Sequence, residues 1–105
     1  MGKKFDSAGE RNRFFYLQEA QKIGHIRNLR CQVKFSLDVN GLHICEYIAD
    51  FVYERLFEGK TVYTVVEDFK GGYRLPPDWP IKQKLMRAIH QVDVKIVKEP
   101  TVPIG

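Results

Sequence analysis

The chain has 105 residues, of which 44% are hydrophobic and 29% are charged. This length fits one domain over residues 1–105, and the balance of residue types excludes a disordered chain. The formal net charge is +4, which permits a polyanionic partner without demanding one. A chain of this size buries one modest core, so formation of a homodimer would add buried surface.

The cysteines, histidines and apolar runs exclude several classes of protein. Cys31 and Cys45 belong to no CxxC pair, and the three histidines lack ligand spacing, so a zinc site is not expected. The stretch MGKKFDSAGE lacks the apolar segment of a signal peptide, and no apolar run is long enough to span a bilayer. We therefore expect a cytoplasmic protein with reduced thiols.

A helix is expected first, from about Ser7 to Lys22. Ser7 and Glu10 have the spacing of a capping box, and Phe14 and Leu17 start an apolar stripe of helical period. Gly24 follows this stripe and ends the helix.

Two strands and a hairpin turn follow this helix. Alternating apolar residues predict strands at 29–37 and 42–53, and Asn40-Gly41 between them favours a tight turn. A hairpin centred on that turn pairs Cys45 with Ser36. Cys31 then lies several residues from Cys45, so we expect no disulfide between the two.

The second half of the chain continues with strand and helix patterns. A turn at 57–60 leads to a strand at 61–70 that is rich in β-branched residues. Glycines and prolines predict a loop at 71–80, and helical periodicity predicts a helix at 81–91. A short strand at 92–97 completes the pattern.

The element order is therefore α-β-β-β-α-β, which predicts an α/β fold of the α+β type with a mixed sheet. The helix between the last two strands makes their connection a right-handed crossover, so these strands are expected to be parallel neighbours. Residues 1–4 and 98–105 are expected to be flexible tails.

Two acids fall at unusual places in the predicted strands. Asp50 interrupts the apolar run YIADFVY, and a charge inside such a strand is costly unless it is paired or bound. Asp68 shares a strand face with Lys70, while Glu67 points to the other face. Because the two strands are consecutive, Asp50 and Asp68 are expected to lie close together. Two converging carboxylates favour a hard cation such as Mg²⁺ or Mn²⁺.

Each of these residues also has a purely structural interpretation. Asp68 and Lys70 would form a surface salt pair, and Asp50 would be a hydrogen-bonded structural acid. Glu10 would be the capping-box partner of Ser7. The ordered set, a helical Glu, an in-strand Asp and then D-x-K on the next strand, favours a functional site over these separate explanations.

This ordered set resembles the PD-(D/E)xK nuclease superfamily, whose restriction-endonuclease-like core is α-β-β-β-α-β. Asp50 matches the acid of the second strand, although IAD replaces PD, and Asp68-Phe69-Lys70 matches the (D/E)xK element. Glu10 matches the helix-one acid of the Holliday-junction resolvase branch. The blocks FDSAGE, IRNLRCQVKF, YIADFVY and VVEDFKG are similar to small phage-encoded members, over about Phe5 to Val97.

The resemblance implies metal-dependent hydrolysis of DNA phosphodiesters in a bacterial or phage-infected cell. It implies that Asp50, Asp68, the backbone carbonyl of Phe69 and Glu10 hold Mg²⁺ or Mn²⁺. Lys70 would orient the attacking water or stabilise developing charge. Gln32 stands where related nucleases often have a polar residue near the site, and a polar residue on an edge strand is the plain alternative.

DNA binding requires cations against the phosphate backbone. Basic residues flank the first helix and cluster after the third strand, and the candidates for phosphate contacts are Lys4, Arg11, Arg13, Arg74, Lys82, Lys84 and Arg87. A solvated helix face explains the residues of the second helix equally well.

Three functions fit these observations. The first is a structure-selective endonuclease, similar to a Holliday-junction resolvase and acting as a homodimer, because a junction has two strands to cut symmetrically. The second keeps the chemistry and changes the substrate to flaps, ends or linear duplex. The third is a non-catalytic DNA-binding or phage-assembly domain on the same fold, which the intact Asp50, Asp68 and Lys70 disfavour.

Overall fold

The computed structural model describes residues 7–70 and 75–104. The elements follow the predicted order and are α1 (Ala8–Lys22), β1 (Ile26–Val39), β2 (Leu42–Phe57), β3 (Lys60–Phe69), α2 (Trp79–His90) and β4 (Lys95–Val97). Neither helix in this part of the chain has the length and apolar character needed to cross a membrane.

Helix α1 begins as its sequence predicts. Ser7 adopts an extended N-cap conformation, and its side-chain oxygen accepts a hydrogen bond from the Glu10 backbone N–H at 3.1 Å. This bond satisfies one of the backbone donors that a helix start leaves without an intrahelical partner. The helix ends before Gly24, which has a φ of +86°.

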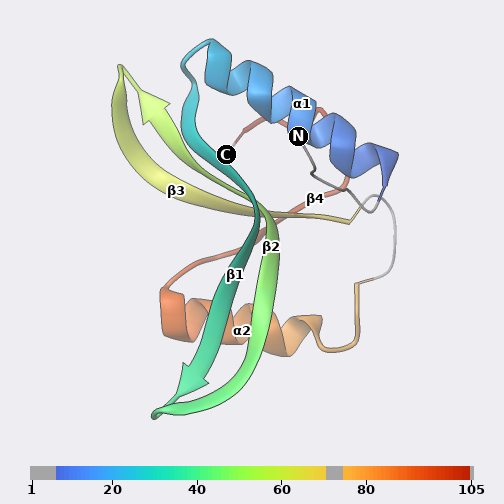
Figure 1. Cartoon of the computed structure of the whole chain (residues 1–105), viewed down its shortest axis with the longest axis vertical. Coiled ribbons are helices and arrows are strands. Elements are labelled where there is room, and N and C mark those ends of the chain that lie inside the picture. The colour runs from blue at the N-terminus through green and yellow to red at the C-terminus, as the bar shows by residue number, and fades with distance from the viewer. Residues whose placement is uncertain (1–6, 71–74, 105) are drawn as a thin grey trace.

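The strands form one four-stranded mixed sheet in the order β1-β2-β3-β4 (Figure 1). Strands β1, β2 and β3 are antiparallel neighbours, and β3 and β4 are parallel neighbours, which confirms the predicted parallel pairing of the last two strands. Strands β1 and β2 are longer than predicted and form an extended, twisted hairpin (Figure 1).

The register of the β1–β2 hairpin differs from the prediction by one residue. Val39 pairs with Leu42 across the Asn40-Gly41 turn, but a bulge follows, so Cys45 pairs with Leu37 rather than with Ser36. A bulge places two residues of one strand opposite one residue of the other, which the regular pattern of side chains does not reveal. Both cysteines are free thiols, as expected.

The two helices pack on opposite faces of the sheet. Neighbouring residues of β2 alternate between two core clusters, with Phe51 and Tyr53 in the cluster of α1 and Val52 in the cluster of α2. The α1 cluster includes Phe14 and Leu17 of the helix itself. Helix α1 lies at the top of Figure 1 and contacts β1 and β3, whereas α2 lies against the long β1–β2 hairpin.

Residues 98–104 contact the rest of the domain, in the segment where the sequence predicts a flexible C-terminal tail. The guanidinium of Arg13 donates to the carbonyl oxygens of Pro100 and Val102. Val102 and Ile104 also pack against the α1 core cluster. These contacts satisfy donors of a buried cation and cover apolar surface. Residues 1–4, the other predicted tail, lie outside the described part of the chain.

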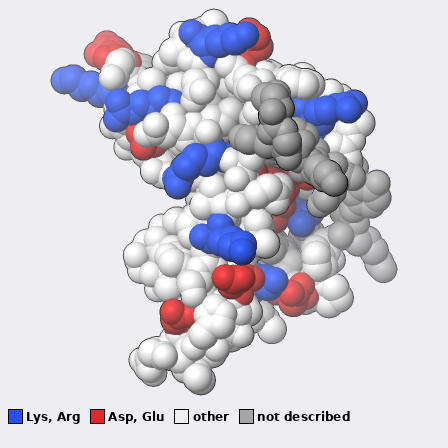
Figure 2. Space-filling model, viewed as in Figure 1, with Lys and Arg blue, Asp and Glu red and all other residues white. Residues whose placement is uncertain are grey.

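On the face shown in Figure 2, the charged side chains of the described residues are interspersed rather than sorted by sign. On the face shown in Figure 2, Lys and Arg side chains form separate groups, with acidic side chains beside several of them. A polyanion approaching this face would meet local groups of cations, so the positions of single basic residues matter more than the net charge.

Candidate active site

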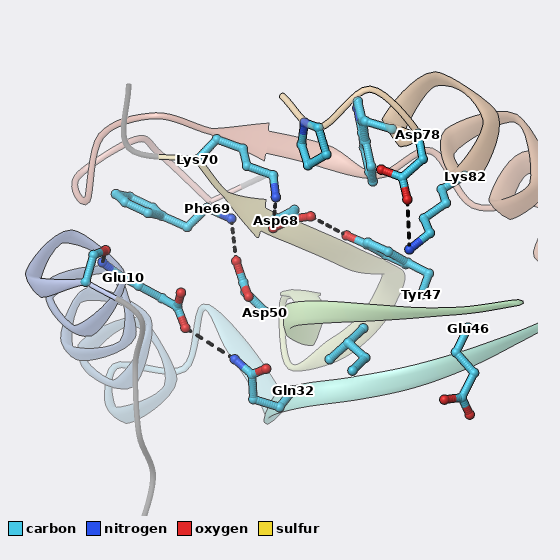
Figure 3. Close-up of a pocket in the computed structure, with 14 residues that line it drawn as sticks. Glu10, Gln32, Glu46, Tyr47, Asp50, Asp68, Phe69, Lys70, Asp78 and Lys82 are labelled. Atoms are coloured by element: carbon cyan, nitrogen blue, oxygen red, sulfur yellow. Dashed lines mark hydrogen bonds and ion pairs between the residues drawn. The ribbon is translucent and has the colours of Figure 1, made fainter. Parts of the chain in front are cut away.

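The candidate site lies where β2 and β3 stop pairing. The last pair of the ladder is Phe51 with Glu67, so Asp50 and Asp68 are the next residues beyond it. Past this point the two strands present side chains to an open cavity of about 750 Å³. Asp50, Asp68 and Lys70 line this cavity together with Glu10 from α1 (Figure 3). The predicted acids are therefore brought to one place.

Asp68 is buried and engaged at both of its carboxylate oxygens. The hydroxyl of Tyr47 donates to Asp68 Oδ2 at 2.9 Å, and Lys70 Nζ lies 3.4 Å from Asp68 Oδ1. The Asp68 side chain is 6% exposed and that of Lys70 is 21% exposed. The pair is thus not the fully solvated surface pair that competes with the functional interpretation.

Asp50 lies in direct contact with Asp68 and with the backbone of β3. Asp50 Oδ2 accepts a hydrogen bond of 2.8 Å from the Phe69 backbone N–H, and the two carboxyl groups share a hydrogen bond. Burial raises the pKa of Asp50 to about 8, and the hydrogen bond and charge of Asp68 and the charge of Glu10 act in the same direction. A bound cation would offset this repulsion between the acids.

Glu10 is almost fully buried and points from α1 toward the same cavity (Figure 3). Its carboxylate accepts a hydrogen bond from the side-chain amide of Gln32 on β1 at 3.2 Å. Gln32 has a φ of +54°, a left-handed conformation that is rare for a residue with a β-carbon. Cys31 pairs with Phe51 and Val33 with Ala49, so this strained residue stands across from Asp50.

Close packing fixes the start of α1 against the end of β3. A β-carbon added to Gly9 would lie 2.7 Å from Cε1 of Phe69, which is closer than real β-carbon contacts. Glycine at this helical position therefore permits the Phe69 ring to lie against the first turn of α1. Glu10 follows Gly9 and Phe69 lies between Asp68 and Lys70, so this contact brings the helix acid to the strand acids.

The oxygen donors of the site fit a hard divalent cation in part. Within residues 7–70 and 75–104, no three His, Cys, Asp or Glu side chains converge closely enough to hold one ion. Asp50 and Asp68 do converge, and Glu10 is near enough for its charge to raise the pKa of Asp50. Two carboxylates, supplemented by water, Glu10 or the predicted Phe69 carbonyl, form a donor set suited to Mg²⁺ or Mn²⁺.

Arg13 does not belong among the DNA-binding residues, which corrects the sequence prediction. Its side chain is 0% exposed, and its guanidinium forms a two-point salt bridge with Glu67 at 2.9 and 2.7 Å. The hydroxyl of Tyr53 also donates to Glu67. Arg13 lies four residues before Leu17, on the face of α1 that meets the sheet, so it has no access to a phosphate.

The other predicted phosphate contacts are distributed unevenly. Lys82 lines the cavity and lies 3.4 Å from Asp78 one helical turn earlier (Figure 3). Three more are exposed but do not line the cavity, namely Arg11 on α1 and Lys84 and Arg87 on α2. Lys4 and Arg74 lie outside the described residues.

Tyr47 is the site residue that the sequence prediction missed. Tyr47 and Asp50 are three residues apart, so strand alternation predicts that they lie on different faces of the sheet. The sequence pattern therefore does not indicate that both side chains reach Asp68. The regular β2–β3 pairing ends at Phe51 and Glu67, before Tyr47 is reached, so the pairing pattern does not predict which side chain Tyr47 meets. Burial, followed by the charge of Asp68, raises the pKa of the Tyr47 hydroxyl above its ordinary value, which keeps it protonated as a donor.

Comparison of the chain with protein-family models, with curated proteins and with solved structures finds no match.

Proposed function

We propose that this protein is a metal-dependent endonuclease that hydrolyses DNA phosphodiester bonds, with Mg²⁺ or Mn²⁺ as its cofactor. The observation that carries the proposal is the convergence of Asp50, Asp68 and Lys70 in one cavity beyond the end of the β2–β3 ladder. Glu10 borders the same cavity from α1. This grouping of two acids and a lysine supports the metal-dependent reaction that the PD-(D/E)xK resemblance implies.

Each side chain has a distinct role in this reaction. Asp50 and Asp68 bind the cation, and Glu10 completes its ligands directly or through water. When bound, Mg²⁺ supplies concentrated positive charge that favours attack of water on the scissile phosphate. Lys70 orients that water or stabilises the negative charge that develops on the phosphate oxygens.

We propose branched DNA as the substrate and a homodimer as the active form. A four-way junction presents two symmetry-related strands, and two copies of one site related by a two-fold axis would cut both. We assign to Lys82 a contact with a phosphate next to the scissile one, and its position in the lining of the same cavity as Lys70 supports this role. The exposed Arg11, Lys84 and Arg87 provide contacts to the backbone further away.

The experiment compares cleavage of a labelled four-way junction, a flap and a matched linear duplex, each with Mg²⁺ and with EDTA. We expect Mg²⁺-dependent cuts in the junction. Cleavage of the flap or the duplex at the same rate would support the nuclease activity but refute the preference for branched DNA. A well-folded protein that binds DNA but cuts none of the three substrates would refute the nuclease and favour a non-catalytic DNA-binding role.

Two variants test the site within that experiment. Asp68→Asn keeps the size of the side chain but removes its charge, and Lys70→Ala removes the ammonium group. Each is expected to lower junction cleavage about 100-fold or more, as loss of a group that stabilises transition-state charge does. DNA binding should persist in both. Glu54→Gln, which disrupts an exposed salt bridge of β2 with Arg27, is the matched control and should cut at the wild-type rate.

A further inference from the structure

Two hydrogen bonds join β2 and β3 beyond their last ladder pair, and the donor belongs to β2 in one bond and to β3 in the other. From β2 to β3, the Tyr47 hydroxyl donates to Asp68 Oδ2 at 2.9 Å. From β3 to β2, the Phe69 backbone N–H donates to Asp50 Oδ2 at 2.8 Å. These bonds cross between the strands where the regular backbone ladder is absent, and each ends on one of the two converging carboxylates.

The hydroxyl of Tyr47 is held in a fixed position by the core. Tyr47 is 4% exposed, and its ring lies 5.4 Å from that of Trp79 and 6.4 Å from that of Phe35, measured between ring centroids. All three side chains belong to, or pack against, the α2 core cluster. A buried aromatic ring between two others has little rotational freedom, so its hydroxyl is a rigid donor.

This donor makes the two oxygens of Asp68 unequal. Oδ2 accepts from Tyr47, whereas Oδ1 lies 3.4 Å from Lys70 Nζ, which lines the cavity. Rotation of the carboxylate would break the buried bond of Oδ2 and leave the Tyr47 hydroxyl without its acceptor. The orientation of Asp68 relative to Asp50 is therefore set by a residue outside the D-x-K element.

We propose that Tyr47 is a positioning residue that holds Asp68 in the orientation in which its Oδ1 and the carboxylate of Asp50 together bind the divalent cation. The inference rests on the proposed function, because it assigns Tyr47 to the same metal site. It predicts that the hydroxyl of Tyr47 controls metal affinity. A merely structural hydroxyl would change the stability of the protein and leave its metal dependence untouched.

The test is Tyr47→Phe, which retains the ring and removes only the hydroxyl. The unfolding temperature is measured at increasing concentrations of Mg²⁺ or Mn²⁺ in the absence of DNA. We expect the half-saturating metal concentration to increase about 10- to 100-fold, the usual effect of removing a group that orients a metal ligand. Phe35→Leu, which keeps the hydroxyl but loosens the packing of the ring, should give a smaller increase.

Tyr53→Phe provides a matched control on the other face of the same two strands. Tyr53 is buried on β2, and its hydroxyl donates to the buried Glu67 of β3, next to Asp68. The substitution removes the same kind of tyrosine–carboxylate bond, so it should lower stability comparably. Its half-saturating metal concentration should equal that of the wild type. An equal increase in both variants would overturn the positioning role of Tyr47.

Failure of this inference and failure of the proposed function give different results. Wild-type metal dependence in Tyr47→Phe would overturn the positioning role, even if the wild type cuts DNA. A Tyr47-dependent metal titration in a protein that cuts no DNA would support the positioning role and refute the nuclease.

Discussion

Replacement of Asp50 by Asn is expected to stabilise the metal-free protein at alkaline pH while it abolishes cleavage. Asp50 Oδ2 accepts from the Phe69 N–H, and its carboxyl group shares a hydrogen bond with Asp68. An Asn side chain retains an acceptor for the Phe69 N–H and gains an amide that can donate to Asp68. The substitution thus mimics the protonated acid and removes the repulsion between the two carboxylates.

The magnitude follows from the pKa of Asp50. Its ordinary pKa is 3.8, and burial, Asp68 and Glu10 raise it to about 8 in the folded protein. The folded protein binds this proton more tightly than the unfolded chain, so its free energy of unfolding falls as pH rises from about 4 to about 8. Without screening, the loss at pH 8 would be about 5 kcal/mol. Solvent in the open cavity weakens the repulsion. We therefore expect the free energy of unfolding of Asp50→Asn at pH 8 to exceed that of the wild type by about 1–2 kcal/mol.

The assay is urea unfolding of wild type and variant between pH 4 and pH 8, with EDTA and with Mg²⁺. The two proteins should be equally stable near pH 4 and diverge as pH rises in EDTA, and Mg²⁺ should stabilise only the wild type. Asp38→Asn is the control, since the hydrogen bonds of His43 and Ser36 lower the pKa of Asp38 and its removal should not stabilise. An Asp50→Asn protein less stable than wild type at pH 8 in EDTA would refute the reasoning.

Three further substitutions test the packing around the site, each by urea unfolding. Gly9→Ala should lower the free energy of unfolding by about 1–2 kcal/mol because the new methyl overlaps Phe69. Adding Phe69→Leu should restore most of that stability, and an unchanged stability of Gly9→Ala would contradict the close approach. The free energy of unfolding of Gln32→Gly should exceed that of Gln32→Ala by about 1 kcal/mol. Both variants lose the side-chain amide, but only glycine adopts the φ of +54° without strain. Equal stabilities of the two variants would exclude that strain. Arg13→Met should lose about 3–5 kcal/mol because it leaves Glu67 buried without its cation, and a loss below about 1 kcal/mol would show that the pair is dispensable.

The sequence sufficed to predict the sheet and the acids that converge on it. Strand alternation and the short turns place β1, β2 and β3 side by side, and consecutive antiparallel strands bring Asp50 beside Asp68. The crossover rule then makes β4 a parallel neighbour of β3. These features depend on local patterns and on chain connectivity, which a single sequence contains.

The partners of charged residues could not be predicted in the same way. Arg13 lies four residues before Leu17, on the face of α1 that meets the sheet, but its charge favours a surface position when the sequence is considered alone. Its partner Glu67 belongs to β3, far away in the sequence. The Tyr47–Asp68 bond depends on where the β2–β3 ladder ends. Such pairings are set by the distance between elements in three dimensions, and alternation within one strand carries no information about that distance.

The contacts at the end of β3 explain why two acids and a phenylalanine follow one another there. Glu67 is tied to Arg13 on the α1 face, Asp68 turns to the opposite face toward Tyr47, and Phe69 returns to pack beneath α1. Three successive residues are thus held from alternating sides, so the strand can neither slide nor rotate without breaking a buried contact. A rigid strand end keeps two like charges close together although they repel each other. That arrangement is costly in the absence of a cation and suited to bind one, which is the physical basis of our proposal of a metal-dependent reaction at this strand end.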